Sequence, residues 1–186
     1  MPQLRNSFVT SFPASGSRKR QQNRADLWLN SPIVYREAAG FRSELQALIP
    51  AFFNPLVAVH HYLSMARAAF DTRDPSGHIR VKKLFYALRA LFACRWVEQI
   101  GTQPPTEFSA LFVTVAHPIE RDWINNLLAI KAAGDETASI TLTQERREAI
   151  ERELRDAGTY AARAPQPIKG NPDSLDAIFR QWITNS

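Results

Sequence analysis

The segment from Val81 to Trp96, VKKLFYALRALFACRW, constrains the fold of this chain more than any other. Its apolar residues recur at spacings of three and four, which is the period of one wide face of an α-helix. Small residues lie beside this face, so neighbouring helices can approach it closely. The pattern predicts a central buried helix over residues 78–100, with the apolar stripe Val81, Leu84, Phe85, Leu88, Leu91 and Phe92.

The rest of the chain also favours helices joined by turns. Asn54 followed by Pro55 is typical of a helix start, and Gly101 followed by two prolines ends the central helix. Further helices are predicted over residues 37–53, 55–70, 106–115, 118–133, 144–157 and 173–184, and the only strand-like run is Ile33-Val34-Tyr35. The predicted fold class is therefore all-α, an orthogonal bundle of about six or seven helices.

Composition divides the chain into four parts. Residues 1–24 lack a sustained apolar period, which predicts a disordered basic tail. Residues 25–158 form the predicted helical domain, and residues 159–172, with three prolines, form a predicted linker. Residues 173–184 are amphipathic and are expected to dock on the body as a C-terminal helix.

The net charge of +5 is located in the tail rather than in the body. Residues 1–25 hold five arginines and lysines and no acid, so the remaining residues carry 18 basic and 18 acidic groups. A neutral body argues against a nucleic-acid-binding fold, because such folds carry clustered positive charge. Binding of nucleic acid through the basic tail, with a strong dependence on salt, stays as an alternative.

The cysteine count and the length of the apolar runs indicate in which cellular compartment the protein is expected. Cys94 is the only cysteine and lies in an apolar run, which excludes a disulfide framework and favours a buried thiol in a reducing compartment. No apolar run reaches about 18 residues, so no membrane span is expected. The tail shares its arginine-rich, acid-free composition with organellar transit peptides, but a cytoplasmic location is the prediction adopted.

The central helix carries the best candidate for a binding face. Lys82, Tyr86 and Arg89 are spaced by four and three residues and therefore share one side of the helix, with Lys83 beside them. One interpretation is a phosphate or nucleotide clamp, in which cationic side chains bind oxygens and the tyrosine contacts a base or ribose.

A structural interpretation of the same residues stays open. Arg89 has apolar neighbours in the sequence, and a buried guanidinium needs a partner. That partner would be Glu98 or Glu107 in an internal ion pair, while the lysines extend to water.

Two other groups of residues contain metal-binding side chains, but their spacing argues against a metal site. His60 and His61 are adjacent, so on a helix they point about 100° apart and do not readily share one ion. Asp71 and Asp74 flank a helix end, where carboxylates are usually solvated caps. No metal site is predicted in the chain.

Six segments occur in a characteristic order: SPIVYRE at 31–37, HHYLSMA at 60–66, VKKLFYALRALFACRW at 81–96, TQPPTEF at 102–108, LLAIKAAGDE at 127–136 and LDAIFRQWI at 175–183. In this order they resemble the C-terminal helical part of a bacterial family of predicted nucleotidyltransferases in the DNA polymerase β superfamily. The resemblance covers residues 26–183. It implies a helical half that holds nucleotide or substrate, with a nucleotide and Mg²⁺ between it and a catalytic palm domain.

Matched positions give the residues expected to bind. The resemblance implies a nucleotide- or substrate-binding role for His61, Tyr62, Lys82, Lys83, Tyr86, Arg89 and Arg95, with Trp96 beside them.

The chain departs from the family at the catalytic motifs. The superfamily uses a Gly-Ser turn for phosphates and aspartates on neighbouring strands for two divalent metal ions. Ser15-Gly16-Ser17-Arg18 resembles the opening of that turn, but no Asp-x-Asp pair follows before the helices. The palm is therefore expected to be absent, no residue is assigned a catalytic role, and the chain alone is expected to be catalytically silent.

The main alternative is a stand-alone helical interaction module, similar to an antitoxin. A surface left uncovered by the palm would expose Leu27, Trp28, Ile33 and Val34, and large apolar patches favour association. The partner would be a palm-domain fragment or a second copy of the chain.

Overall fold

The computed structural model describes residues 40–133, 137–164 and 171–184. In these ranges it contains seven helices and two short strands, which confirms the predicted all-α class. The predicted tail at 1–24, the Gly-Ser-like tetrapeptide and the apolar patch around Trp28 lie outside the described residues. No described helix is long and apolar enough to span a membrane.

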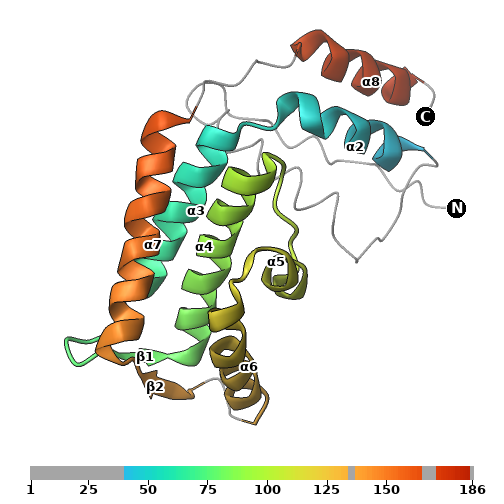
Figure 1. Cartoon of the computed structure of the whole chain (residues 1–186). Helices are drawn as coiled ribbons and strands as arrows, with labels where there is room; N and C mark the ends of the chain where they lie inside the picture. The colour runs from blue at the N-terminus through green and yellow to red at the C-terminus, as the bar shows by residue number, and fades with distance from the viewer. Residues whose placement is uncertain (1–39, 134–136, 165–170, 185–186) are drawn as a thin grey trace, which may run out of the picture.

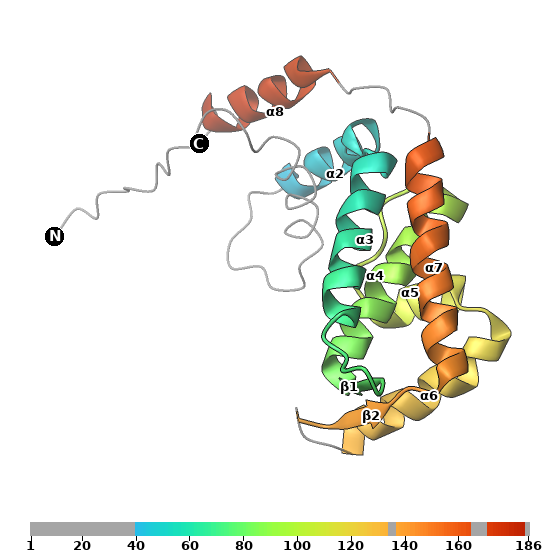
Figure 2. The same cartoon turned by 90° about the vertical axis from the view of Figure 1, so that its left-hand side faces the viewer.

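Three long helices form the body of the molecule (Figure 1). They are α3 (Pro55–Phe70), α4 (Val81–Ile100) and α7 (Gln144–Arg163). Both views show them side by side, with α3 running opposite to α4 and α7 (Figure 2). Helices α5 (Phe108–Val115) and α6 (Pro118–Ala133) cover a further side of α4. The central position predicted for the helix over 78–100 is therefore confirmed.

The sequence signals at the helix ends act as expected. The Asn54 side chain accepts a hydrogen bond from the Val57 amide at 3.0 Å, and Pro55 occupies the first turn of α3. At the end of α4, Gly101 adopts a left-handed conformation with φ of 73°, which closes the helix. The α4 stripe supplies much of the core, and its largest fully buried neighbours are Phe70, Ile79, Leu111, Ile124 and Leu127.

The only cysteine lies inside this core. The Cys94 Sγ is 3.8 Å from the Val59 carbonyl of α3, in the tight contact that small side chains permit. Burial, with the negative charges of Glu98 and Glu153, raises the pKa of the thiol to about 12. The predicted buried, inert thiol is confirmed.

Two strands were not predicted. β1 (His78–Arg80) and β2 (Ser139–Thr141) pair antiparallel, with Ile79 opposite Ile140. Residues 78–80 were expected to start the central helix, which instead begins at Val81. Each strand has three residues, too few for an alternating pattern to stand out in a sequence.

Two helix boundaries also differ from the prediction. The α7 helix was expected to end at residue 157, but it continues to Arg163, so the proline-containing linker begins later than residue 159. Ala157 and Ala161 extend its buried seam, and Leu63 and Arg67 of α3 lie beside Gly158. The α5 helix begins at Phe108 rather than at residue 106.

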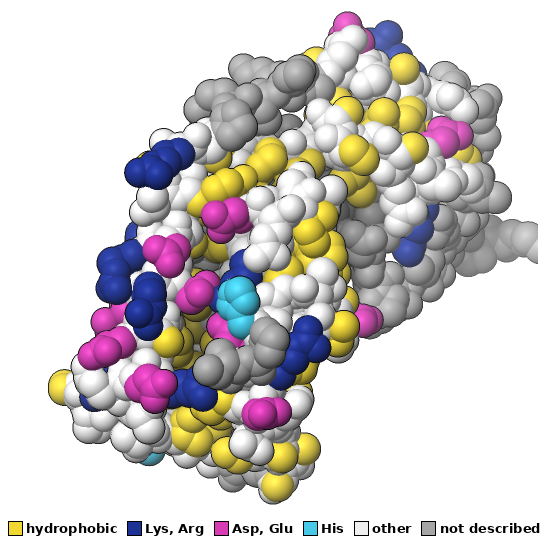
Figure 3. All heavy atoms as spheres, in the orientation of Figure 1, with side chains coloured by type: hydrophobic (Ala, Val, Ile, Leu, Met, Phe, Trp, Pro, Cys, Tyr) yellow, Lys and Arg dark blue, Asp and Glu magenta, His cyan; other side chains and the backbone are white. Residues whose placement is uncertain are grey.

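The C-terminal helix packs against the N-terminal helix of the described chain rather than against α3, α4 or α7. Helix α8 (Pro172–Thr184) packs against α2 (Phe41–Phe52), and the Trp182 indole donates to Glu44 at 2.9 Å. The Phe41 ring meets Trp182 edge-on, with centroids 5.5 Å apart. Figure 3 shows apolar side chains at the surface over this pair, and charges of both signs mixed over α7.

Candidate functional site

Helices α3 and α4 carry no acidic residue over most of their length. From Pro55 to Phe70 and again from 81 to 97 the sequence holds no aspartate or glutamate. The same two stretches hold five arginines and lysines and two histidines. Two of the five, Arg67 and Arg95, lie against α7. The local excess of positive charge away from α7 therefore comes from Lys82, Lys83 and Arg89.

Helix geometry brings most of the predicted binding residues to one flank of this pair. Leu63 of α3 lies near α7, on one flank, and Arg95 of α4 points to the same side. Tyr86 lies on the side of α4 opposite Arg95, with Lys82 and Lys83 on either side of it, and Tyr62 lies about 100° round α3 from Leu63. We call this set the basic face; it comprises His61, Tyr62, Lys82, Lys83, Tyr86 and Arg89.

The members of the basic face differ in exposure. Lys82, Lys83 and His61 are exposed, and Tyr86 is 49% exposed, which is high for so large an aromatic side chain. Tyr62 is half-buried and meets the His61 ring edge-on at 5.3 Å. The two packed helices therefore expose both cationic and aromatic side chains.

Arg89 joins the basic face to the loop after α4. Its Nε and Nη2 atoms donate to the Thr106 carbonyl at 3.1 and 2.8 Å. The partner is thus a backbone oxygen, in place of the ion pair with Glu98 or Glu107 that the structural interpretation proposed.

Arg95 lies apart from the other predicted binding residues. It is 7% exposed, and its guanidinium bonds to both oxygens of Glu120 at 2.9 and 3.1 Å. It also donates to the Val115 carbonyl at 2.9 Å and pairs with Glu153 of α7 at 2.8 Å. Among the described residues, the buried arginine is therefore Arg95, whereas Arg89 is only half-buried.

The cluster of Arg95, Glu120 and Glu153 makes the stability of the fold depend on pH. Burial raises the pKa of Glu120, but hydrogen bonds from Arg95 and from the His117 amide outweigh it and leave the pKa below its ordinary value of 4.5. A depressed pKa means that this contribution to stability is complete above pH 4.5 and is lost as the pH falls through the folded-state pKa.

We expect the melting temperature of the protein to fall as the pH is lowered below about 4.5. Glu120→Gln, which cannot titrate, should flatten this part of the profile. Thermal unfolding, followed by circular dichroism between pH 3 and pH 7 at about 0.1 M salt, measures the melting temperature of the wild-type protein and of the variant. Parallel profiles for the two proteins would show that Glu120 is not responsible.

A groove lies between α2 and the loop after α4. Its volume is about 630 Å³. Trp96 forms part of its wall and donates its indole N–H to Thr102 at 3.0 Å, so α4 holds the loop at two points, Trp96 and Arg89. The lining consists of Gln46, Ile49, Pro50, Phe53, Trp96 and residues 101–107 with Ala110.

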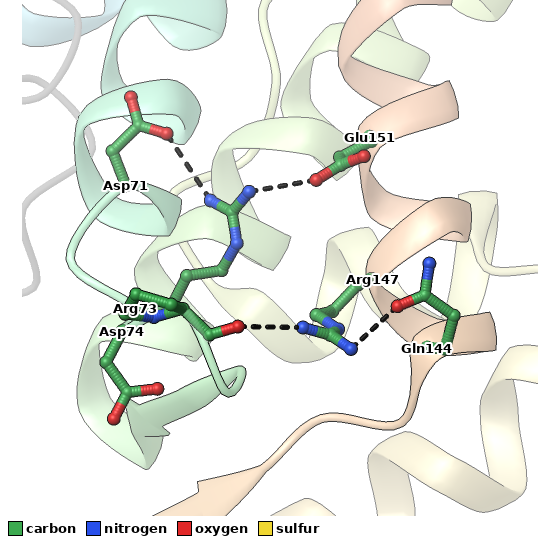
Figure 4. A pocket seen from close by; sticks show the side chains of 7 residues that line it. Asp71, Arg73, Asp74, Gln144, Arg147 and Glu151 are labelled. Atoms are coloured by element: carbon green, nitrogen blue, oxygen red, sulfur yellow. Dashed lines mark hydrogen bonds and ion pairs between the residues drawn. The ribbon is translucent and has the colours of Figure 1, made fainter.

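A smaller polar pocket of about 350 Å³ lies between the turn after α3 and the start of α7 (Figure 4). Arg73 pairs with Glu151 at 2.8 Å and with Asp71 at 3.4 Å, and Arg147 donates to the Pro75 carbonyl at 3.3 Å. These contacts tie the turn to α7. The residues are of both signs and bond to one another, which indicates a structural role.

The described residues do not fit a Mg²⁺ site. No group of three or more histidine, cysteine or acidic side chains gathers to hold an ion in the described ranges. The Asp74 carboxylate accepts bonds from the Ser76 hydroxyl at 2.7 Å and the His78 amide at 2.9 Å, as expected of a capping carboxylate. Accordingly, we assign no metal-dependent step to these residues.

Comparison with known proteins identifies the family. Residues 23–181 match the model of RlaP, the RNA repair pathway DNA polymerase beta family. The match spans most of the chain, which therefore belongs to this family. The six sequence segments suggested a member of the DNA polymerase β superfamily, and the match to this family confirms that resemblance.

One relative is an uncharacterized protein, YcgL of Bacillus subtilis (strain 168). It is 38% identical over 110 residues, which cover 59% of this chain and 42% of YcgL. The chain thus matches less than half the length of this relative. No solved structure matches the chain.

Proposed function

We propose that this chain is a helical, substrate-holding part of a nucleotidyl transfer enzyme that acts in RNA repair, and that it binds nucleotide phosphates on the basic face. The observation that carries the proposal is the absence of acidic residues from α3 and from residues 81–97 of α4, together with the exposure of Lys82, Lys83 and Tyr86. The family description supports the reaction class and the RNA repair role.

The residue types suit this task. Lysine ammonium groups bind phosphate oxygens as point charges, and an exposed tyrosine ring offers a surface for a base or a ribose. Lys131 of α6 lies over the Phe85 ring of α4 at 5.1 Å and adds a further positive charge near α4.

Catalysis itself is proposed to need residues beyond those described. Nucleotidyl transfer in this superfamily uses divalent metal held by carboxylates, and no group of three or more such ligands gathers in the described ranges. We propose that a palm domain supplies the metal site and that the helical part holds the substrate against it.

The Lys82→Glu/Lys83→Glu double variant tests the proposal. It should weaken binding of a fluorescent nucleoside triphosphate and of labelled single-stranded RNA by about tenfold or more at low salt, because two attractive contacts become repulsive. Fluorescence anisotropy at two salt concentrations measures the affinity and the salt slope, which should become shallower.

A matched control carries the same change of charge elsewhere. Arg152→Glu/Arg155→Glu alters two exposed residues of α7, outside the basic face, and should change affinity little. Equal weakening by both pairs would point to net charge alone, and unchanged binding by the lysine variant would contradict the proposed face.

A protein-binding module is the second candidate. Phe179 and Ile183 of α8 are 45% and 74% exposed, although the helix is amphipathic. Exposed apolar side chains of this kind are typical of association surfaces. This observation supports a partner at the α2–α8 pair and is compatible with a substrate on the basic face.

A further inference from the structure

The basic face and the groove are joined along one stripe of α4. Lys82, Tyr86, Arg89 and Trp96 follow at spacings of four, three and seven residues, so they lie in a row on one side of the helix. The row is about 21 Å long, since an α-helix rises 1.5 Å per residue. Arg89 and Trp96, at its far end, hold the loop that walls the groove.

The groove has the chemistry of a base-binding site rather than of a phosphate site. Trp96, Phe53 and the two adjacent prolines provide flat apolar surfaces, and Gln46 and Gln103 carry amide groups that can donate and accept. Glu107 is the one charged residue among the described residues of the lining. Aromatic and apolar walls with a few polar groups are the usual means of holding an unstacked base.

We propose that the groove holds a base of a single-stranded RNA whose phosphates run along Lys82, Lys83 and the Arg89 end of the basic face. This inference rests on the proposed function and adds to it the polymeric nature of the substrate and a second subsite. The row from Lys82 to Trp96 is longer than one nucleotide, which favours a strand over a free nucleotide. Bases inside a duplex are stacked and paired, so they cannot enter the groove.

Trp96→Leu is the first test, with Trp96→Phe as its matched control. Both variants lose the hydrogen bond to Thr102, but only leucine lacks an aromatic face. Trp96→Leu should weaken binding of labelled single-stranded RNA by about tenfold, and Trp96→Phe should retain most of the affinity. Equal losses in the two variants would overturn the stacking role. Equal weakening of nucleoside triphosphate binding would overturn the RNA strand as the occupant, because that result would assign the groove to a free nucleotide.

A second variant covers the case in which Trp96→Leu does not fold. Gln103→Glu places a negative charge in the groove without changing shape, and should weaken RNA binding about fivefold or more. Asn125→Asp makes the same change on the exposed surface of α6 and should have little effect. Equal effects of the two variants, or none from Gln103→Glu, would contradict the groove as the base site.

Cross-linking locates the base directly. Single-stranded RNA that contains 5-iodouridine, irradiated with the full chain, should attach to the peptide that contains Trp96, and double-stranded RNA should not. The Lys82→Glu/Lys83→Glu variant separates the two proposals. If the lysine variant weakens binding but the groove variants and the cross-links do not respond, the base site is wrong and the proposed function stands; if no variant weakens binding, both are wrong.

Discussion

Replacing Arg95 with methionine is expected to lower the free energy of unfolding by about 3–5 kcal/mol. The guanidinium is 7% exposed and joins α4 to Glu120 of α6 and Glu153 of α7. Its removal leaves two carboxylates without their counter-charge, and Val115 without a donor to its carbonyl. Urea unfolding followed by tryptophan fluorescence measures the change, which should appear in the midpoint of the transition.

Two further variants show whether the cost comes from the orphaned charges. The triple variant Arg95→Met/Glu120→Gln/Glu153→Gln removes all three charges and should recover part of the stability, since neutral replacements of buried ion pairs are often tolerated. Arg89→Met, which breaks bonds to one exposed carbonyl, should cost about 1 kcal/mol. A single Arg95→Met variant as stable as Arg89→Met would contradict the central role of the cluster.

Phe92→Ala is the second large expected effect, a loss of about 3–5 kcal/mol. Phe92 is 2% exposed, stacks on Phe108 with centroids 5.9 Å apart, and supports the Arg95 guanidinium at 5.4 Å from its ring. Alanine would leave a cavity between α4 and α5. Thermal or urea unfolding of the purified variant measures the loss.

The control for Phe92 is an aromatic residue at the surface. Phe179→Ala removes a side chain that is 45% exposed and should cost much less, about 1 kcal/mol. Because Phe92 and Arg95 are in contact, their double variant should depart from the sum of the single changes by about 0.5 kcal/mol or more. Strict additivity would show that the contact in the structure contributes nothing.

The sequence predicts this fold well where the helical period is long. The apolar stripe from Val81 to Phe92 is buried in full, and the capping pair Asn54-Pro55 starts a helix where expected. The role of Arg95 was also within reach of the same pattern. It follows Leu88 by seven residues and Leu91 by four, so it lies on the apolar stripe, and a charge at such a position predicts an internal partner.

Other features depend on contacts between distant parts of the chain. Glu120 and Glu153 lie 25 and 58 positions from Arg95, and no local spacing selects them from the 18 acids in the sequence. The groove likewise forms where α2 meets the loop after α4, so its lining could not be read from either segment alone. The basic face was predictable as a row on α4, but its extension to Tyr62 depends on how α3 packs.

The burial of Cys94 makes the chain convenient for spectroscopy. A thiol with a pKa of about 12 inside the core is almost entirely protonated at neutral pH and inaccessible to maleimides. A cysteine introduced at an exposed position of α8 or α4 can then be labelled selectively while the native thiol stays in place. Pairs of dyes or spin labels attached in this way would report directly on the separation between the α2–α8 pair and the long helices in solution.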